Sequence, residues 1–570
     1  GYDEVLRYGC LQTFKAYNEI LGYVPRFVQI SVIYYHIWQI HRIVNDSNAL
    51  NFLSNEQKNR YIDLLKQIFS YIDEEVIDSF GLASAWFYHK AGMLNLYKNI
   101  APSSERQICY VEKYDARNSE ALFYYFAPAN SIASFKINEK EIIPSERKIL
   151  SHTFLDQIFV YEYRYWIPLD SDGLFSLEID GKPVKIGFGG KHHKGGVHVK
   201  DIKQAFKVPP KYPNTGDIWI VMDRDVQADD NAEHFYRYVK ENHPEVECYF
   251  ALRKHSHDWL RLEQEGFDLL DFGSYRFERI LKNCSKIISS HADDYIVDYF
   301  KDQGLRNKDF IFLPHGVFQN DLFDWMNSKI QMMSLFITTT NEEHQSIAGD
   351  FNHYKYGNKV VKQLGFPRHD ALLKNNNFGT KTILVMPTWR KYLVGSLDTK
   401  TGLWQENANF MESIYAQSWK SFLSSSELQK LVETYSYKII FAPHKNIEAY
   451  LPQFDLPDYV QVWKAGQSGS IQELFQHADF MITDYSSVAF EMAYLNKLVL
   501  YYHFDYTEFF DNQWNRGYFD YEKHGFGPVS VSQQDLLKQI ELVLKNDSQP
   551  FTPYKERIEH TFSNRDQNNC

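Results

Sequence analysis

The sequence predicts an α/β protein with a pair of Rossmann-like, parallel-sheet domains, preceded by a helical segment and a small β domain. From Asp217 onward, short apolar strands alternate with helices in two successive runs, separated by the polar linker Asn375–Asn377. Two runs of this kind predict two parallel sheets. Before them, residues 3–100 carry apolar side chains at helical spacing, and residues 115–205 form short aromatic and β-branched segments between turn signals.

Length and composition indicate a folded protein of several domains. The chain has 570 residues, of which 44% are hydrophobic and 16% aromatic. A chain of this length is expected to form about three or four domains. The formal net charge of -12 argues against a general nucleic-acid-binding protein, so we expect no nucleic acid partner. An anionic substrate would then need a local cationic or dipolar pocket.

Cysteine content and hydropathy indicate the cellular compartment of the protein. The cysteines are scattered, odd in number and without a CxxC pair, which favours a reducing compartment and predicts no zinc site. No apolar run is long enough to span a bilayer, and no signal peptide is visible. We therefore expect a cytoplasmic protein whose membrane contact, if any, is peripheral. The abrupt ends, at Gly1 and Cys570, suggest a piece excised from a longer protein.

The clearest helical pattern in the first hundred residues runs from Ser54 to Phe80. Ser54 and Gln57 have the spacing of a capping box at its start. The apolar face is predicted to pack against a neighbouring helix, and the alternative is contact with a membrane surface.

The middle region predicts a small β domain. Its clearest strands are Ala121–Phe126, Ile158–Tyr163 and Leu174–Ile179. The basic segment Lys191–Gly196 near its end is interpreted as a solvated loop, with phosphate contact as the alternative.

Polar residues follow four of the strands in the carboxyl-terminal half. These segments are Leu313–Gly316 (LPHG), Pro387–Arg390 (PTWR), Pro443–Lys445 (PHK) and Thr483–Ser487 (TDYSS). They follow the predicted strands Phe310–Leu313, Thr382–Met386, Lys438–Ala442 and Phe480–Ile482. Further strands are predicted at Ile218–Met222, Cys248–Leu252, Ile287–Ser289, Phe336–Thr338, Tyr459–Val462 and Leu498–Tyr502, with a helix at Asn231–Asn242. Because ligands bind at the carboxyl ends of parallel strands, these four segments predict the site.

The residue types in these segments suit a diphosphate. After Thr483–Ser487 an amphipathic helix is predicted to begin near Ser487, and a helix N-terminus attracts phosphate; ordinary serine capping is the alternative. Arg390 is a candidate for fork-like pairing with a diphosphate. His315 and His444 each follow a proline at a strand end, and histidine can act as a general base or contact a phosphate near neutral pH.

Asp223-Arg224-Asp225 has the form of the DxD metal site of nucleotide-sugar transferases. It ends the first strand of the first α/β run. We interpret it as a loop that places Arg224 near the acceptor, and we predict no metal site.

Taken together, these segments resemble the CDP-glycerol glycerophosphotransferases, a family that includes teichoic acid and bacterial capsule polymerases. Further matches are Asp230–His234, Leu364–Arg368 and Arg516–Tyr521, and the resemblance covers residues 215–545. The resemblance implies a GT-B-like fold, with the active site between two Rossmann-like domains. The resulting division is a helical region at 1–110, a β domain at 111–212, an acceptor-side domain at 213–375 and a donor-binding domain at 376–570.

The resemblance also implies roles for individual residues. His315 would be the general base, with His444 as the second catalytic residue. The implied contacts to the donor phosphates and nucleotide come from Thr388, Arg390, Lys445, Thr483, Asp484, Ser486 and Ser487. The implied acceptor-side residues are Asp230, Asn231 and Arg516. The sequence departs from the family at Glu491, where aspartate is usual, and at Lys445, where proline is frequent.

The function predicted from the resemblance is transfer of glycerol phosphate from CDP-glycerol to a growing capsule or teichoic-acid-like polymer, with release of CMP. The acceptor would be a phosphate-containing oligosaccharide or polymer, and no cofactor is expected. The alternatives are a transferase that uses CDP-ribitol, a GT-B glycosyltransferase that uses a nucleotide sugar, and a non-enzymatic carbohydrate-binding subunit.

Overall fold

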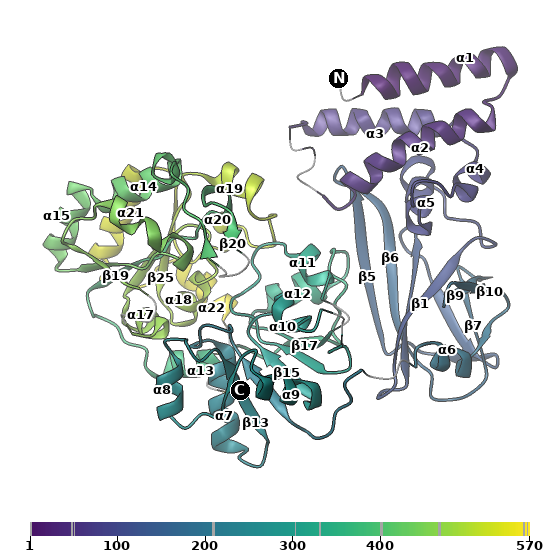
Figure 1. Ribbon diagram of the computed structural model, residues 1–570. Helices are drawn as coiled ribbons and strands as arrows, with labels where there is room; N and C mark the ends of the chain where they lie inside the picture. The colour runs from purple at the N-terminus through teal and green to yellow at the C-terminus, as the bar shows by residue number, and fades with distance from the viewer. Residues whose placement is uncertain are drawn as a thin grey trace. The chain divides into compact units, whose positions relative to one another are not determined.

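The computed structural model forms two compact units (Figure 1). Unit 1 comprises Gly1–Pro209 with Ile347–Lys359, and unit 2 comprises Pro210–Ser346 with Val360–Cys570. The structure describes the whole chain except residues 1–2, 47–49, 51, 208–210, 302–303, 330–331, 399–402, 465–468, 563–564 and 567. The short segment Ile347–Lys359 thus belongs to unit 1, although the sequence around it belongs to unit 2.

Helices begin unit 1, as predicted. They are η1 (Val5–Leu11), α1 (Gln12–Leu21), α2 (Arg26–Ile43), α3 (Asn55–Phe69), α4 (Glu74–Ser79), α5 (Phe87–Met93) and η2 (Leu94–Lys98). The predicted helix from Ser54 to Phe80 is divided into α3 and α4. Ser54 and Gln57 form the predicted capping box at the start of α3. Leu65, Ile68 and Phe69 are fully buried, which confirms that this face packs inside the protein.

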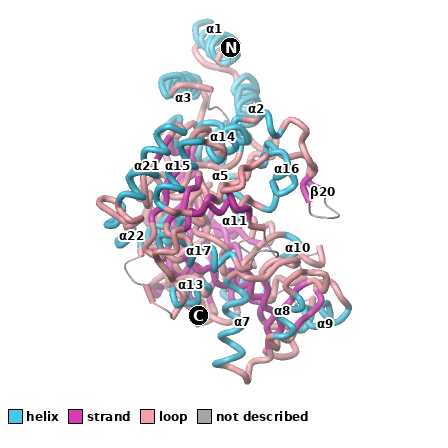
Figure 2. Tube along the Cα trace, turned by 90° about the vertical axis from the view of Figure 1, so that its left-hand side faces the viewer, coloured by secondary structure: helices cyan, strands magenta, loops and turns pink. Residues whose placement is uncertain are grey.

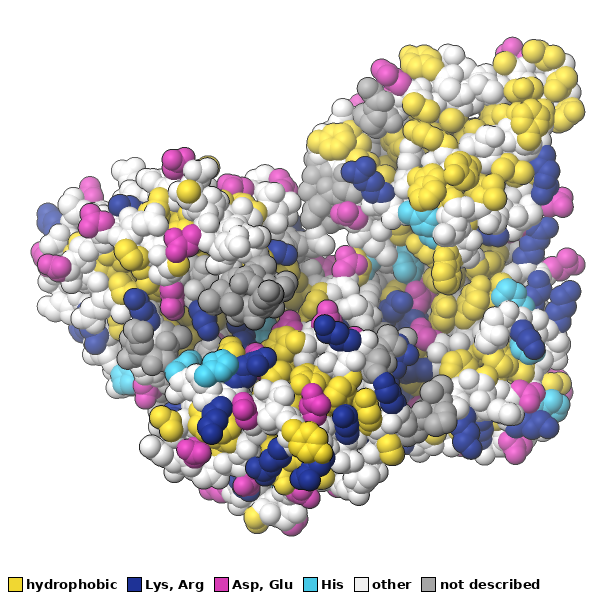
Figure 3. Space-filling model, viewed as in Figure 1, with side chains coloured by type: hydrophobic (Ala, Val, Ile, Leu, Met, Phe, Trp, Pro, Cys, Tyr) yellow, Lys and Arg dark blue, Asp and Glu magenta, His cyan; other side chains and the backbone are white. Residues whose placement is uncertain are grey.

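Apolar side chains remain exposed on the first two helices and the turn between them. Ile20 is 79% exposed, Phe27 65% and Trp38 55%. Figure 3 shows yellow side chains gathered over this part of unit 1. Within the described residues, no helix has the length and hydropathy needed to cross a bilayer. Peripheral contact with a membrane stays a prediction.

Two sheets complete unit 1, with strand orders β10-β9-β1-β2-β6-β5 and β11-β7-β3-β4. The segment Lys191–His193, predicted as a loop, is a strand that pairs with β9. The elements are β1 (Ile108–Asp115), β2 (Glu120–Ala127), β3 (Ala133–Ile137), β4 (Lys140–Ile142), β5 (Glu146–Phe154), β6 (Gln157–Pro168), β7 (Leu174–Ile179), β8 (Lys182–Pro183), β9 (Lys185–Phe188), β10 (Lys191–His193), β11 (Val197–His198) and α6 (Val199–Ala205).

Unit 2 contains two lobes, each built on a parallel sheet. The first lobe has the strand order β14-β13-β12-β15-β16-β17-β18. Its elements are β12 (Trp219–Met222), α7 (Asn231–Asn242), β13 (Cys248–Leu252), α8 (Trp259–Gln264), β14 (Leu269–Asp271), α9 (Tyr275–Asn283), β15 (Lys286–Ser289), α10 (Asp294–Val297), β16 (Asp309–Phe312), α11 (Phe323–Asn327), β17 (Met333–Thr338), α12 (Asn341–Ala348), β18 (Val361–Gln363) and α13 (Arg368–Lys374).

The second lobe repeats the pattern with the order β23-β22-β19-β24-β25-β26. Its elements are β19 (Thr382–Val385), η3 (Lys391–Leu393), β20 (Leu397–Asp398), β21 (Leu403–Trp404), η4 (Phe410–Glu412), α14 (Ile414–Leu423), α15 (Ser426–Tyr435), β22 (Lys438–Phe441), η5 (Lys445–Tyr450), α16 (Leu451–Phe454), β23 (Val460–Val462), α17 (Ile471–His477), β24 (Phe480–Thr483), α18 (Ala489–Tyr494), β25 (Leu498–Tyr502), α19 (Tyr506–Asn512), α20 (Tyr521–His524), β26 (Val529–Ser530), α21 (Gln533–Lys545) and α22 (Tyr554–Thr561).

Both lobes have the strand order of a Rossmann fold, which confirms the predicted fold class. The strands are parallel and mostly buried, with helices packed around them (Figure 2). In each lobe the strand order reverses at one point, between β12 and β15 and between β19 and β24. Ligands of such sheets bind at this point, beyond the carboxyl ends of the strands.

Candidate active site

A cavity of about 220 Å³ lies between the lobes of unit 2 and brings both candidate histidines together. His315 follows β16 of the first lobe and His444 follows β22 of the second. The cavity is lined by Asp223, Arg224, Gln227, Ala228, Asp229, Asp230, His291, His315, Arg368, Met386, Pro443, His444, Lys445, Glu448, Trp463, Ile471, Gln472, Phe475, Val488 and Glu491. The expected convergence of strand ends from two lobes is therefore present.

His315 is held by its loop and by a second histidine. Its ring stacks on that of His291, with ring centroids 4.8 Å apart and planes 12° apart. Pro314 is the residue before His315, and its carbonyl accepts a 2.7 Å hydrogen bond from the Asn231 side chain. This bond holds the His315 loop in place. His315 is exposed to the cavity, but protein surrounds its other sides, and this desolvation lowers its pKa below the usual value near 6.5. Near neutral pH the ring is thus uncharged and can accept a proton.

Gly316 allows the second lobe to approach this loop closely. A side chain at residue 316 would place its Cβ 2.7 Å from the Ser487 Oγ. Ser487 belongs to the turn after β24, and the next residue, Val488, lines the cavity. Because Gly316 has no side chain, the His315 loop and the Thr483–Ser487 turn can pack closely against each other.

His291 and Arg224 complete this side of the cavity. The Arg224 Nε donates to the His291 Nε2 at 3.3 Å. His291 is buried, and desolvation holds its pKa well below the usual value, with further lowering from the positive charge of Arg224. Arg224 itself is exposed within the cavity, where it supplies a positive charge.

His444 is oriented by its own loop and by Trp389. The two rings stack with centroids 5.6 Å apart and planes 19° apart. The His444 Nδ1 accepts a hydrogen bond from the Asn446 backbone N–H at 3.2 Å. Desolvation, with the positive charge of Arg224, lowers the His444 pKa to about 3. The neutral ring therefore carries its proton on Nε2, which makes Nε2 a hydrogen-bond donor.

Arg368 joins the two lobes beside this cavity. It is buried and pairs with Asp230 of the first lobe and with Glu491 of the second. The His369 Nε2 lies 3.0 Å from the other Glu491 oxygen. Arg368 holds the Glu491 pKa at about 2, against the opposing effect of desolvation. Glu491 is thus a partner of an ion pair across the two lobes.

The DxD segment serves mainly as a helix cap. Asp223 is 1% exposed, and its carboxylate accepts hydrogen bonds from the backbone N–H groups of Asp230, Ala232 and Glu233 at the start of α7. The Ser290 hydroxyl also donates to it. Within the described ranges, no group of three or more histidine, cysteine, aspartate or glutamate side chains is arranged to hold a metal ion.

Arg390 lies in a buried network behind the cavity. Its guanidinium is fully buried and pairs with Asp484 at 2.9 Å and with Asp505 at 2.8 Å. It also donates to the Thr388 carbonyl, and the Asp484 carboxylate accepts from the Thr388 backbone N–H. Arg390 thus ties together the loops after β19, β24 and β25, and this indicates a positioning role.

The Thr483–Ser487 turn differs from its predicted form. The helix after it, α18, begins at Ala489 and has six residues. Its N-cap residue is Val488, without a side-chain capping bond, so neither serine caps the helix. The Thr483 hydroxyl is buried and donates to the Met386 carbonyl at 2.6 Å. Ser486 and Ser487 are half-buried.

The structure separates the predicted site residues into two groups. His315, His444, Lys445 and Asp230 line the cavity. The described lining does not include Thr388, Arg390, Thr483, Asp484, Ser486, Ser487, Asn231 or Arg516. Arg516 instead lies over the Tyr506 and Phe510 rings. The predicted contacts of this second group with substrate stay predictions.

Sequence reasoning did not single out His291 or Arg368 as site residues. His291 comes two residues after β15, and a polar residue after a strand was the signal used for the four other segments. Arg368 appears in the sequence motifs only as the last residue of the segment Leu364–Arg368. Its partners are 138 and 123 residues away in sequence, so nothing local indicates the pairing.

Two Rossmann-type lobes with a polar cavity at their strand ends define a GT-B-like fold. The family model described as CDP-glycerol:poly(glycerophosphate) glycerophosphotransferase matches residues 205–570. The chain therefore belongs to this family, and the predicted resemblance is confirmed.

Curated relatives come from teichoic acid synthesis. The minor teichoic acid biosynthesis protein GgaB of Bacillus subtilis is 35% identical over 363 residues, which cover 62% of this chain and 39% of GgaB. The teichoic acid poly(glycerol phosphate) polymerase of Bacillus subtilis is 21% identical over 380 residues, which cover 59% of this chain and 45% of the polymerase. The chain thus spans less than half the length of these relatives.

Among solved structures, a variant of the wall teichoic acid polymerase TagF is similar with a TM-score of 0.44 and 14% identity, covering 62% of this chain and 85% of that chain. A UDP-GlcNAc 2-epimerase of Methanocaldococcus jannaschii gives a TM-score of 0.36 and 14% identity, covering 60% of this chain and 97% of that chain.

Proposed function

We propose that this chain transfers glycerol phosphate from CDP-glycerol to the end of a growing teichoic-acid-like or capsule polymer and releases CMP. The carrying observation is a cavity between two Rossmann-type lobes that holds His315 and His444 in a chain of the glycerophosphotransferase family. The family description supports the donor and the reaction type. The family model covers residues 205–570, and we extend the proposed activity from this region to the whole protein.

In the proposed reaction, a hydroxyl oxygen of the acceptor attacks the phosphorus that carries the glycerol of CDP-glycerol. A new phosphorus–oxygen bond forms, the bond between this phosphorus and the oxygen of CMP breaks, and CMP leaves. The acceptor proton passes to His315. The lowered pKa of His315 supports this role, because a base must be unprotonated to accept the proton.

Positive and hydrogen-bonding groups are available for the diphosphate. Arg224 and Lys445 are basic side chains that are exposed in the cavity. The His444 Nε2–H is a neutral donor, because Nδ1 accepts from Asn446. Fixed donors of this kind stabilise the charge that develops on the transferred phosphoryl group. Arg368 pairs with both Asp230 and Glu491 and offsets part of their negative charge, so they repel the donor less.

The proposed donor can be tested by parallel incubation with CDP-glycerol, CDP-ribitol and a UDP-sugar, each with a poly(glycerol phosphate) oligomer as acceptor. We expect CMP release and lengthening of the oligomer with CDP-glycerol. CMP from CDP-ribitol alone would identify a ribitol phosphate transferase. UDP release with a lengthened glycan, and no CMP from either CDP-alditol, would identify a glycosyltransferase and contradict the proposal.

We expect kcat/KM to fall on the acid side of its pH profile with a midpoint below pH 6.5. The reason is that His315 loses its function when protonated, and its pKa lies below the usual value. Activity should therefore be complete at pH 7 and fall as the pH falls through the pKa of the folded protein. An acid midpoint above pH 7 would contradict this assignment.

The variant Arg224→Gln tests whether the charge of Arg224 contributes to the lowered pKa of His315. The Arg224 charge lowers the pKa of His315, so its removal should raise that pKa and move the acid midpoint to higher pH. The same substitution at Arg276, an exposed arginine over the Tyr249 ring, should leave the midpoint in place.

A further inference from the structure

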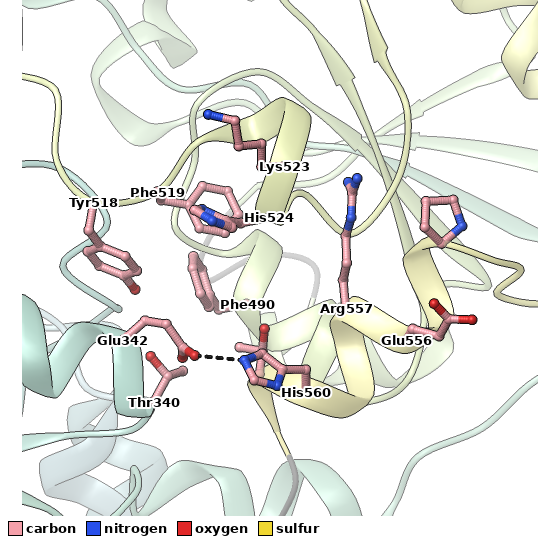
Figure 4. A pocket seen from close by; sticks show the side chains of 12 residues that line it. Thr340, Glu342, Phe490, Tyr518, Phe519, Lys523, His524, Glu556, Arg557 and His560 are labelled. Atoms are coloured by element: carbon pink, nitrogen blue, oxygen red, sulfur yellow. Dashed lines mark ion pairs between the residues drawn. The ribbon is translucent and has the colours of Figure 1, made fainter.

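A second cavity in unit 2 has about 380 Å³ of volume (Figure 4), and neither His315 nor His444 lines it. Its lining comes from the start of α12, from α18, from the segment before and within α20, and from α22. The residues are Thr340, Glu342, Phe490, Tyr518, Phe519, Lys523, His524, Pro553, Glu556, Arg557, His560 and Thr561. Its volume is within the range of about 300–1,000 Å³ that ligand sites occupy.

Aromatic rings form one wall of this cavity. Phe490 and Phe519 are held in the core, with ring centroids 5.1 Å apart. Tyr518 is half-buried beside them, and Figure 4 shows its ring on the side of Glu342 and Thr340. Phe490 and Phe519 are 1% and 9% exposed, so Tyr518 is the ring whose face can contact the carbon–hydrogen face of a sugar.

Basic side chains line this cavity together with Glu342 and Glu556. Lys523 and His524 come from α20, and Arg557 and His560 come from α22 (Figure 4). His560 pairs with Glu342 at 3.1 Å, and Lys523 pairs with Asp520 at 3.0 Å. The Arg557 Nη1 donates to the Gly525 carbonyl at 3.1 Å, which steadies the guanidinium. Arginine and lysine in such positions suit the oxygens of a phosphate or phosphodiester.

One helix separates the two cavities. Val488 and Glu491, at the start of α18 and within it, line the cavity with His315, whereas Phe490 lines the second cavity. The two cavities therefore share α18 as a common wall. Glu342 belongs to the first lobe and His560 to the second, so a ligand here contacts both lobes.

We infer that this second cavity binds a sugar-phosphate unit of the acceptor polymer at a distance from its reacting end. The inference rests on the proposed function for the identity of the polymer. Tyr518 would contact the sugar, and Lys523, Arg557 and His560 would contact the phosphodiester. This would give longer acceptors higher affinity than short ones, because a second contact adds to the one at the reacting end.

A blocking substitution tests this inference. Glu556 is exposed and lines the cavity, whereas Glu559 is exposed on the same helix and is outside the lining. We expect Glu556→Trp to raise the KM for a long glycosylated poly(glycerol phosphate) acceptor about tenfold, and Glu559→Trp to leave it unchanged. KM for a single-unit acceptor should not change in either variant. Equal effects of the two variants would overturn the inference.

A charge substitution tests the phosphate contact. Lys523 and His560 have side chains that are 76% and 79% exposed, so the double variant Lys523→Ala/His560→Ala should fold normally. We expect a rise of about three- to fivefold in the KM for the long acceptor, as for exposed charge contacts. Lys545→Ala, which removes a similar exposed ion pair on α21, is the control. An unchanged KM in the double variant would contradict the phosphate contact.

Two further measurements separate this inference from the proposed function. Binding of the same oligomer to the whole chain is measured by calorimetry without any donor, so the cavity is tested even if no donor is turned over. Binding that persists unchanged in Glu556→Trp would overturn the inference alone. A raised KM for CDP-glycerol with an unchanged acceptor KM would assign the cavity to the donor nucleotide and would also overturn it.

Discussion

Replacement of His315 by alanine is expected to lower kcat for CMP release from CDP-glycerol by roughly 10²–10⁴-fold, the usual contribution of a positioned general base. The affinity for CDP-glycerol should change little. His315 is neutral and stacked on His291, so it adds no charge to the donor site. The measurements are CMP release at saturating substrate and donor affinity by calorimetry.

The control is His243→Ala, which removes an exposed histidine at the end of α7. This variant should keep normal turnover. Added imidazole should restore part of the activity of His315→Ala, because a small base can enter the space left by the ring. Near-normal turnover in His315→Ala would rule out this residue as the base. A large loss of donor affinity with unchanged kcat would instead assign it to binding.

The alternation of strands and helices carried most of the information about the fold. The predicted Asn231–Asn242 helix and the strands Cys248–Leu252 and Leu498–Tyr502 have the same limits in the structure. Buried parallel strands give continuous apolar runs, so their ends are visible in sequence. Short edge strands such as β18, with two of three residues exposed, lack this signal and were not predicted.

The sequence predicted those features of the candidate site that depend only on where the strands end. His315 and His444 come from separate lobes, and both follow buried strands, so their convergence in one cavity follows from the fold. Side-chain direction was not predictable in the same way. Arg390 also follows a strand, but its guanidinium turns toward Asp505, which is 115 residues later in the sequence. No local pattern distinguishes an arginine that binds a ligand from one that pairs with carboxylates.

Residues 347–359 show a second limit of prediction from sequence, which concerns the assignment of a short segment to a domain. They lie within the predicted acceptor-side domain, but in the structure they group with unit 1. The Lys148 ammonium donates to the Ile347 carbonyl at 2.9 Å, and the Ser151 backbone N–H donates to the Asn352 carbonyl at 3.0 Å. Such contacts join segments about 200 residues apart, and composition does not change where the chain enters and leaves this segment.

Replacement of Arg390 by methionine is expected to destabilise the second lobe by about 3–5 kcal/mol, the usual cost of removing one partner of a buried ion pair. Asp484 and Asp505 would then be buried without a compensating charge. Burial already raises the Asp484 pKa, and Arg390 opposes that shift, so Asp484 is expected to take up a proton in the variant. The measurement is amide hydrogen exchange in β19 and β24, which should become faster.

The matched control is Arg253→Ala, which removes a partly exposed arginine paired with Asp225 and should cost about 0.2–1 kcal/mol. Combining Arg390→Met with Asp484→Asn and Asp505→Asn should recover part of the lost stability, because both uncompensated carboxylates are then removed. This pattern distinguishes a positioning arginine from one that binds the donor. An Arg390→Met variant with unchanged hydrogen exchange and much weaker CDP-glycerol binding would show that the guanidinium leaves its carboxylates to contact the diphosphate. The buried network would then be a resting arrangement, and the role predicted for Arg390 from the sequence would hold.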